Sequence, residues 1–194
     1  DVSGAYVEKY MPLFKKPELR MAMLSFAAME AIHIFAYSQV VDTLGFPETE
    51  YNKFLDYAEM KNKHEFLWEE PWIINQDLKY ADEHKFIPED IVDAGREAGY
   101  TDKKIEEIFN LAYGLAKFSA FSEGLQLFSS FAMLMNFSRF GLMKGMSQIV
   151  AWSVRDESLH VATMIRVFKE LTKDYPWLWT ESFQEELTKL ARTM

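Results

Sequence analysis

The sequence predicts an all-α protein built as a helical bundle, and three observations lead to this fold class. Long stretches carry apolar residues at helical spacing, whereas the apolar–polar alternation of a β-strand is not sustained anywhere. Hydrophobic residues make up 49% of the 194 residues, which is enough to bury a core in a single domain over 1–194. Prolines and glycines also fall where long helices would begin and end.

The first half of the chain is expected to contain two helices. Residues 1–16 form a short helical or irregular entry. A long helix then begins at Pro17, which suits a first helical position, and ends near Thr43, just before Gly45. This helix is apolar on nearly all sides, so we expect it to be buried in the bundle. A second, more polar helix covers about 48–67.

The second half is dominated by two more long helices. Residues 68–100 are the least regular region, with a helix start at Pro88. Thr101 suits the N-cap of a helix that runs to about Asn136. Two further helices follow, at about 142–173 and about 179–192.

Composition narrows the class of protein. The formal net charge of −9 disfavours non-specific binding to nucleic acid. The absence of cysteine excludes disulfides, thiolate metal sites and cysteine nucleophiles, and nothing indicates secretion. No uninterrupted apolar run is long enough to span a membrane. We therefore expect a cytoplasmic protein with neither a nucleic-acid nor a membrane partner.

One motif occurs twice. Glu30 and His33 form a Glu-x-x-His pair in the first long helix, and Glu157 and His160 form another in the last long helix. Residues i and i+3 share a helix face, so each pair points one way, into apolar surroundings. A single such pair is usually a surface coincidence. Two pairs among only four histidines, on apolar helices, favour a metal site, because buried carboxylates are costly when nothing balances their charge.

A third carboxylate lies on another long helix. Glu123 sits in the middle of the 101–136 helix, and the neighbouring Gly124 suggests a local π-bulge, a distortion often found at functional sites. Two helices with Glu-x-x-His and two with one carboxylate each is the layout of ferritin-like dinuclear metal proteins. Oxygen ligands with a few imidazoles suit iron or manganese better than zinc. The missing carboxylate should come from a helix upstream of Pro17.

Two more residues lie close to these ligands in sequence. Tyr37 follows His33 by four residues and so shares its helix face. It is either a tyrosine that a metal centre oxidises or a core tyrosine with a hydrogen-bonded neighbour. Asp156 either orients a ligand histidine or pairs with Arg155 or Arg20.

These residues resemble those of a known family. The chain is similar to the small, radical-generating subunit of class I ribonucleotide reductase across nearly its whole length. Tyr37, one turn after His33, and the Arg155-Asp156-Glu157 run are the more specific matches. The matching stretches are FAAMEAIHIFAY at 26–37, SEGLQLFSSF at 122–131 and VRDESLH at 154–160.

The resemblance implies a role for each residue. The metal ligands would be Glu30, His33, Glu123, Glu157 and His160. Tyr37 would be oxidised to a stable radical after the metals react with oxygen. Asp156, hydrogen-bonded to His33, would lie on the proton-coupled electron path, and Leu127 and Phe131 would line the apolar pocket around the radical.

The resemblance also implies partners and missing parts. It implies two metal ions, with Fe/Fe favoured over Mn/Mn or Mn/Fe, a homodimer, and a large subunit that reduces ribonucleotides to deoxyribonucleotides. The family's sixth ligand, an aspartate, falls just before Asp1 in the alignment, so we expect it to be missing from this chain, with Asp1 as the alternative ligand. We therefore expect a domain without some N-terminal residues and without the family's C-terminal tail.

Two other functions stay open on the sequence alone. One is a ferritin-like metal-dependent oxidase or monooxygenase that acts on a bound organic substrate in a cavity over the metals. The other is an iron-storage or structural bundle, which would form a cage-like assembly.

Overall fold

The computed structural model describes residues 2–47, 49–58, 60–61 and 87–193, and within these ranges the regular structure is helical throughout. The predicted all-α class is confirmed. The predicted 48–67 helix lies partly outside the described residues, and Asp1 lies wholly outside them. The elements in chain order are α1 (Val2–Gly4), η1 (Ala5–Tyr10), η2 (Met11–Leu13), α2 (Pro17–Leu44), α3 (Thr49–Asn52), η3 (Lys53–Asp56), α5 (Glu89–Glu97), α6 (Asp102–Leu115), η4 (Ala116–Gln126), α7 (Leu127–Arg139), α8 (Lys144–Asp174), η5 (Pro176–Leu178) and α9 (Glu181–Thr193).

The chain divides into two compact units, each formed by two separate stretches of sequence. The first unit comprises 1–65 and 128–160, and the second comprises 66–127 and 161–194. Helix α8 contributes residues to both units. The single domain expected from the sequence stays a prediction.

Helix α2 is the longest element that lies wholly within the first unit. Pro17 occupies its first turn, and Gly45 ends it with a φ of 71°, a left-handed conformation that glycine adopts without strain. The predicted start is confirmed, and the end differs by one residue. By length and composition α2 is apolar enough to cross a membrane, with a mean hydropathy of 1.4 over an 18-residue window, but core helices of soluble proteins pass the same test. An uninterrupted apolar run is a stricter criterion, which α2 does not meet because Ser25, Glu30 and His33 interrupt its apolar residues.

Helix α2, which we expected to be buried in the bundle, is buried on one face only within this chain. One face is buried and carries Glu30 and His33, whereas large apolar side chains on other faces are exposed. Ile32 and Phe35 are 65% and 66% exposed. An apolar helix surface indicates burial somewhere, but sequence alone does not say whether the covering surface belongs to the same chain.

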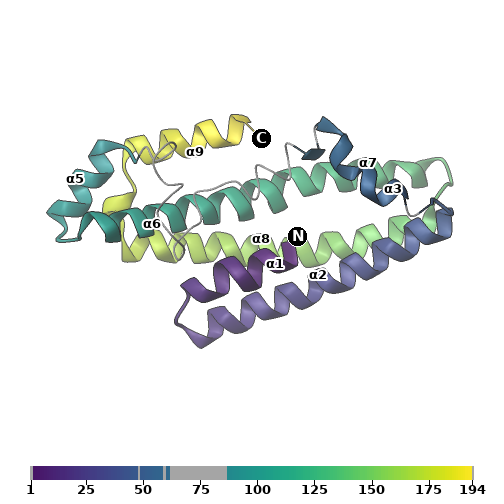
Figure 1. Cartoon of the computed structure of the whole chain (residues 1–194), viewed down its shortest axis with the longest axis horizontal. Coiled ribbons are helices and arrows are strands. Elements are labelled where there is room, and N and C mark those ends of the chain that lie inside the picture. Colours follow the sequence, from purple (N-terminus) through teal and green to yellow (C-terminus); the bar gives the residue numbers. More distant parts are fainter. Residues whose placement is uncertain (1, 48, 59, 62–86, 194) are drawn as a thin grey trace. The chain divides into compact units, whose positions relative to one another are not determined.

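The N-terminal segment packs on α2. Figure 1 shows α1 and the short helices after it lying along the first half of α2. The Ser3 hydroxyl donates to the carbonyl of Ala27 at 3.1 Å, and Arg20 donates to the carbonyl of Met11 at 3.1 Å. Tyr6 and Tyr10 are fully buried. The segment predicted as a short helical or irregular entry is therefore helical, with a π-helix and a 3₁₀ helix that add aromatic rings to the core.

The second unit has its own apolar core, formed where α5, α6, η5 and α9 meet. Thr101 caps α6 as predicted, because its hydroxyl accepts a hydrogen bond from the amide of Lys104 at 3.4 Å. Gly95 allows α5 to approach α6 closely. A Cβ at this position would lie 2.6 Å from Cγ1 of Ile105, so no larger residue fits without repacking.

Candidate metal centre

The two Glu-x-x-His pairs lie on neighbouring helices of the first unit. Glu30 and His33 come from the middle of α2, and Glu157 and His160 come from the part of α8 that belongs to this unit. All four residues are buried, and none is more than 8% exposed. The i,i+3 spacing brings each glutamate and its histidine to one helix face, and the two faces meet.

The ligand atoms of the four residues converge. Nδ1 of His33 lies 3.2 Å from Oε1 of Glu157 and 3.5 Å from Oε1 of Glu30. Nδ1 of His160 lies 3.1 Å from Oε2 of Glu157 and 3.4 Å from Oε1 of Glu30. One ligand atom from each of Glu30, Glu157 and His160 lies within 4.8 Å of the others. Both imidazoles thus direct the same nitrogen at the same two carboxylates.

This set fits a hard divalent cation. Oε1 of Glu30 is buried and lacks a hydrogen-bond partner among the described residues, although two imidazole nitrogens are within 3.5 Å. A buried carboxylate oxygen left in this state is costly, and a cation would satisfy it. Two carboxylates with two imidazoles are typical ligands for iron or manganese.

The charged groups of the metal-free site favour a positive charge among the carboxylates. The carboxylates of Glu157 and Glu30, with that of Asp156, raise the pKa of His33 to about 10. Burial by itself would raise the pKa of Glu30, but the imidazoles of His160 and His33 outweigh burial and lower that pKa to about 2. At neutral pH His33 is therefore protonated, and its imidazolium supplies the positive charge among these carboxylates.

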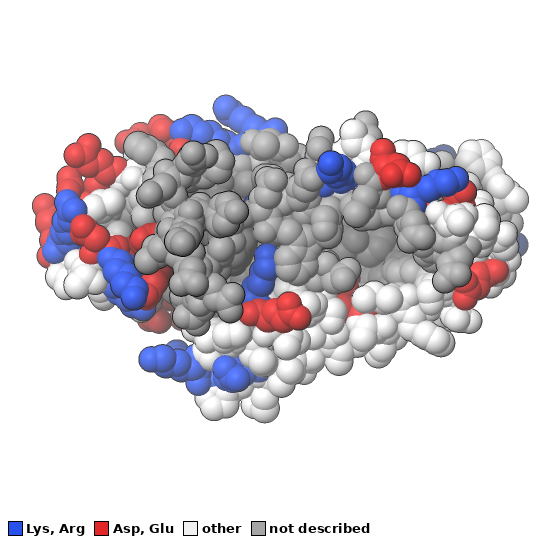
Figure 2. Space-filling model, viewed as in Figure 1, with Lys and Arg blue, Asp and Glu red and all other residues white. Residues whose placement is uncertain are grey.

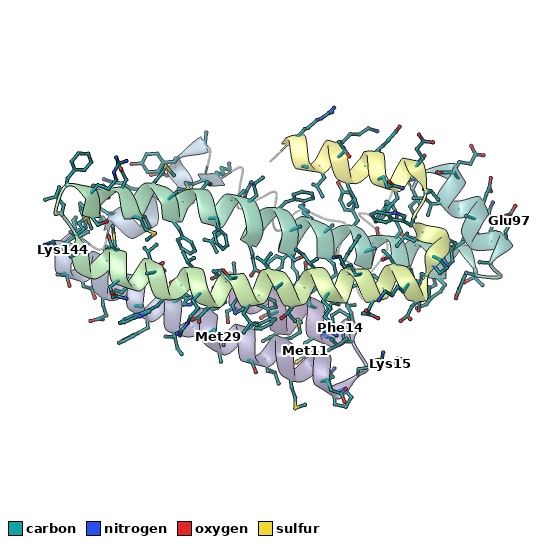
Figure 3. The ribbon with its side chains drawn as sticks, turned by 180° about the vertical axis from the view of Figure 1, so that it is seen from behind. Met11, Phe14, Lys15, Met29, Glu97 and Lys144 are labelled. Carbon is teal, nitrogen blue, oxygen red and sulfur yellow. The ribbon has the colours of Figure 1, made fainter. Side chains whose placement is uncertain are left out.

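The outer nitrogens of the two histidines have different partners. Nε2 of His33 lies 3.2 Å from Oδ2 of Asp156, a half-buried carboxylate that also approaches Arg155 at 3.7 Å. Nε2 of His160 lies 3.3 Å from the sulfur of Met29, which is located in the middle of α2 (Figure 3). Such partners fix the orientation of a ligand imidazole. Asp156 was among the expected residues, whereas Met29 was not, although it precedes Glu30 in the sequence.

Aromatic rings surround His160. The ring of Phe26 lies 4.3 Å from the imidazole, and the ring of Tyr6 lies 5.8 Å from it in an edge-on arrangement. Both side chains are buried. They make the side of the site formed by α2 and η1 apolar, which strengthens electrostatic interactions within it.

Tyr37 lies one turn beyond His33 on α2. Its hydroxyl donates a hydrogen bond to Oγ of Ser153 on α8 at 3.0 Å. Burial raises the pKa of the Tyr37 phenol, so the phenol is neutral at ordinary pH. Ser153 was not among the residues predicted from the sequence, although it precedes Glu157 by four residues and so shares that face of α8.

The other residues named from the sequence are divided between the units. Glu123 belongs to the second unit, where it is buried on η4, and η4 is a π-helix as its neighbour Gly124 suggested. Leu127 also belongs to the second unit and is half-buried. Phe131 lies on α7 in the first unit and is buried.

Comparison with known proteins identifies the family. A family model described as "Ribonucleotide reductase, small chain" matches residues 1–194, the whole chain. The chain belongs to this family. It is 41% identical over 199 residues to a probable ribonucleoside-diphosphate reductase small subunit of Invertebrate iridescent virus 6, in a match that covers 100% of the chain and 50% of that relative.

Two other relatives extend the comparison. A probable ribonucleoside-diphosphate reductase small subunit of Invertebrate iridescent virus 3 is 44% identical over 171 residues, with 88% of the chain and 41% of the relative covered. A ribonucleoside-diphosphate reductase subunit beta of Chlamydia pneumoniae is 23% identical over 175 residues, in a match that covers 90% of the chain and 44% of that relative. The chain thus spans half the length of these curated relatives or less.

Membership in the ribonucleotide reductase small-chain family confirms the resemblance stated from the sequence. The helical bundle is consistent with the ferritin-like fold expected for this family. The family is metal-dependent, and the buried carboxylates and histidines of α2 and α8 are a group that suits a metal ion.

Proposed function

We propose that the chain is part of a ribonucleotide reductase small subunit in which a dinuclear metal centre generates a radical on Tyr37. The observation that carries this proposal is the convergence of both Nδ1 atoms on Glu30 and Glu157, with Tyr37 one helical turn away. Family membership supports the same function.

The proposed ligands are the four buried residues of the first unit and one from the second. Glu30, His33, Glu157 and His160 would hold the metal ions, together with Glu123. We favour two iron ions, with Mn/Mn or Mn/Fe as the alternatives, because the donor set suits both metals. When bound, the metal pair supplies the oxidising power, drawn from oxygen, that removes one electron from Tyr37.

In this proposal, residues of the protein set the protonation state of Tyr37 and protect its radical. Burial holds the phenol neutral, so an electron and a proton leave it together. Oδ2 of Asp156 forms a hydrogen bond with Nε2 of His33 and so fixes the orientation of the imidazole. Because Asp156 is half-buried, this hydrogen bond connects the buried imidazole to a partly exposed carboxylate. Phe131, with Leu127, is proposed to keep water and reductants away from the radical.

We further propose that the partners are a large subunit and a second copy of this chain. The large subunit would use the radical to reduce ribonucleotides to deoxyribonucleotides, which agrees with the names of the relatives. The second copy would cover the exposed apolar side chains of α2, where Met21 and Leu24 join Ile32 and Phe35. Figure 2 shows that much of the visible surface of α2 carries no charge.

The remaining expectations belong to the same proposal. A net charge of −9 agrees with a cytoplasmic protein that does not bind nucleic acid. In this proposal α2 is a core and interface helix rather than a membrane span, because its middle carries Glu30 and His33 paired with α8.

The test is electron paramagnetic resonance spectroscopy of the metal-loaded protein. Metal-free protein takes up ferrous iron without air, and oxygen is then admitted. We expect a tyrosyl signal in the wild type that is lost in Tyr37→Phe. Tyr113→Phe is a matched control, because Tyr113 is also a half-buried tyrosine whose pKa burial raises, and it lies in the second unit. A signal that persists in Tyr37→Phe would contradict the assignment. Metal uptake without any signal, but with oxidation of an added organic substrate, would favour the oxidase instead.

A further inference from the structure

Ser153 is a buried residue with a polar contact that neither the sequence motifs nor the family match explains. It lies on α8 and is 1% exposed. Its Oγ accepts the hydrogen bond of the Tyr37 hydroxyl at 3.0 Å. Ser153 precedes Glu157 by one helical turn, so the same face of α8 carries a ligand and the partner of the tyrosine.

The contact differs from the usual behaviour of a serine within a helix. A helical serine commonly donates to the carbonyl four residues earlier, as Ser158 does to Val154 on the same helix at 2.6 Å. Ser153 instead joins two helices through a side chain 116 positions away in the sequence. A buried hydroxyl without a partner is unfavourable, so the two hydroxyls hold each other in place.

A serine hydroxyl can reverse its role in a hydrogen bond. It carries one proton and two lone pairs, and it turns about the Cβ–Oγ bond. While Tyr37 is a phenol, Ser153 accepts. A phenoxyl oxygen has no proton to give, and at the same separation only the proton of Ser153 can restore the hydrogen bond.

We propose that Ser153 is the positioning residue of Tyr37, accepting from its phenol and donating to its phenoxyl radical. The proposal rests on the proposed function, in which Tyr37 is oxidised. That oxidation would break the O–H bond of Tyr37 and remove one electron and one proton from it, for which the bound metal pair would supply the oxidising power. Ser153 keeps its own proton throughout and holds the tyrosine oxygen at one position in both forms.

The radical of the loaded protein provides the first test. A donated hydrogen bond gives the phenoxyl a hyperfine coupling to a proton that exchanges in D₂O, and it lowers the largest g value. We expect electron–nuclear double resonance to detect this coupling in the wild type and in Ser153→Thr, which keeps a hydroxyl. We expect Ser153→Ala to lose the coupling and to raise the g value. Ser158→Ala removes an exposed hydroxyl from the same helix and should change neither.

A second readout needs no metal. With tyrosine labelled at the ring carbon that bears the hydroxyl, the carbon resonance of Tyr37 in metal-free protein should shift in Ser153→Ala but not in Ser158→Ala. An unchanged resonance, or an exchangeable coupling that survives in Ser153→Ala, overturns the role of Ser153. A shifted resonance in a protein that forms no tyrosyl radical instead refutes the proposed function, and it leaves the contact to Tyr37 established without its radical role.

Discussion

Metal binding should release a proton from His33, and the number of protons can be worked out from the structure. Three carboxylates raise the pKa of this imidazole to about 10, so at pH 8 it carries about 0.99 of an extra proton, against about 0.03 for an imidazole with an ordinary pKa of 6.5. A protonated nitrogen cannot bind a metal. Because Nε2 lies against Asp156, the proton that leaves is the one on Nδ1, which lies between Glu157 and Glu30.

Isothermal titration calorimetry measures this release. Mn²⁺ is added without air to metal-free protein at pH 8, in buffers with different enthalpies of ionisation, and the dependence of the heat on the buffer gives the number of protons released. We expect the wild type to release about one proton more than His33→Gln, whose amide has no proton to lose. The ¹⁵N resonances of His33 in the metal-free protein should show an imidazolium at the same pH. Equal release from both proteins, together with a neutral imidazole, would refute the reasoning.

Three further predictions concern stability. The raised pKa of His33 stabilises the metal-free protein fully below pH 6.5, and this contribution is lost as the pH rises through about 10, so Tm should fall over that range more in the wild type than in His33→Gln. Glu157→Ala should lower the free energy of unfolding by about 3–5 kcal/mol, because the imidazoles of His33 and His160 each lose a carboxylate 3.1–3.2 Å away. Urea denaturation measures this loss, and equal urea midpoints for the variant and the wild type would contradict the prediction. Gly95→Ala should cost about 1–3 kcal/mol, because its Cβ would meet Ile105 at 2.6 Å, whereas Gly145→Ala, with open space around its Cβ, should not lower Tm.

The common helix face of each Glu-x-x-His pair could be predicted from the sequence because its geometry is local. A spacing of three residues within a helix fixes the common face of Glu30 and His33 without any knowledge of the tertiary structure. The ends of α2 could also be predicted, because Pro17 and Gly45 begin and end the helix through their own backbone conformations. Gly124 beside Glu123 indicated the π-helix of η4 for the same reason.

The contacts between helices could not be predicted in this way. Whether Ser153 faces Tyr37, or Met29 faces His160, depends on how far each helix is rotated and shifted along its neighbour, which local spacing does not determine. The choice among a histidine, Arg155 and Arg20 as partners of Asp156 stayed open for the same reason, until the structure placed Asp156 against His33 at 3.2 Å and near Arg155 at 3.7 Å. The exposure of one face of α2 could not be predicted either, because an apolar helix sequence does not show whether the surface that covers it belongs to the same chain.

Anomalous X-ray diffraction from crystals loaded with manganese would test the central claim most directly. We predict two manganese peaks in the first unit, with oxygen atoms of Glu30 and Glu157 and Nδ1 of His33 and His160 among their ligands. We also predict that Glu123 contributes an oxygen. Manganese bound only elsewhere, or no ordered manganese beside these residues, would contradict the proposal that α2 and α8 hold a metal centre next to Tyr37.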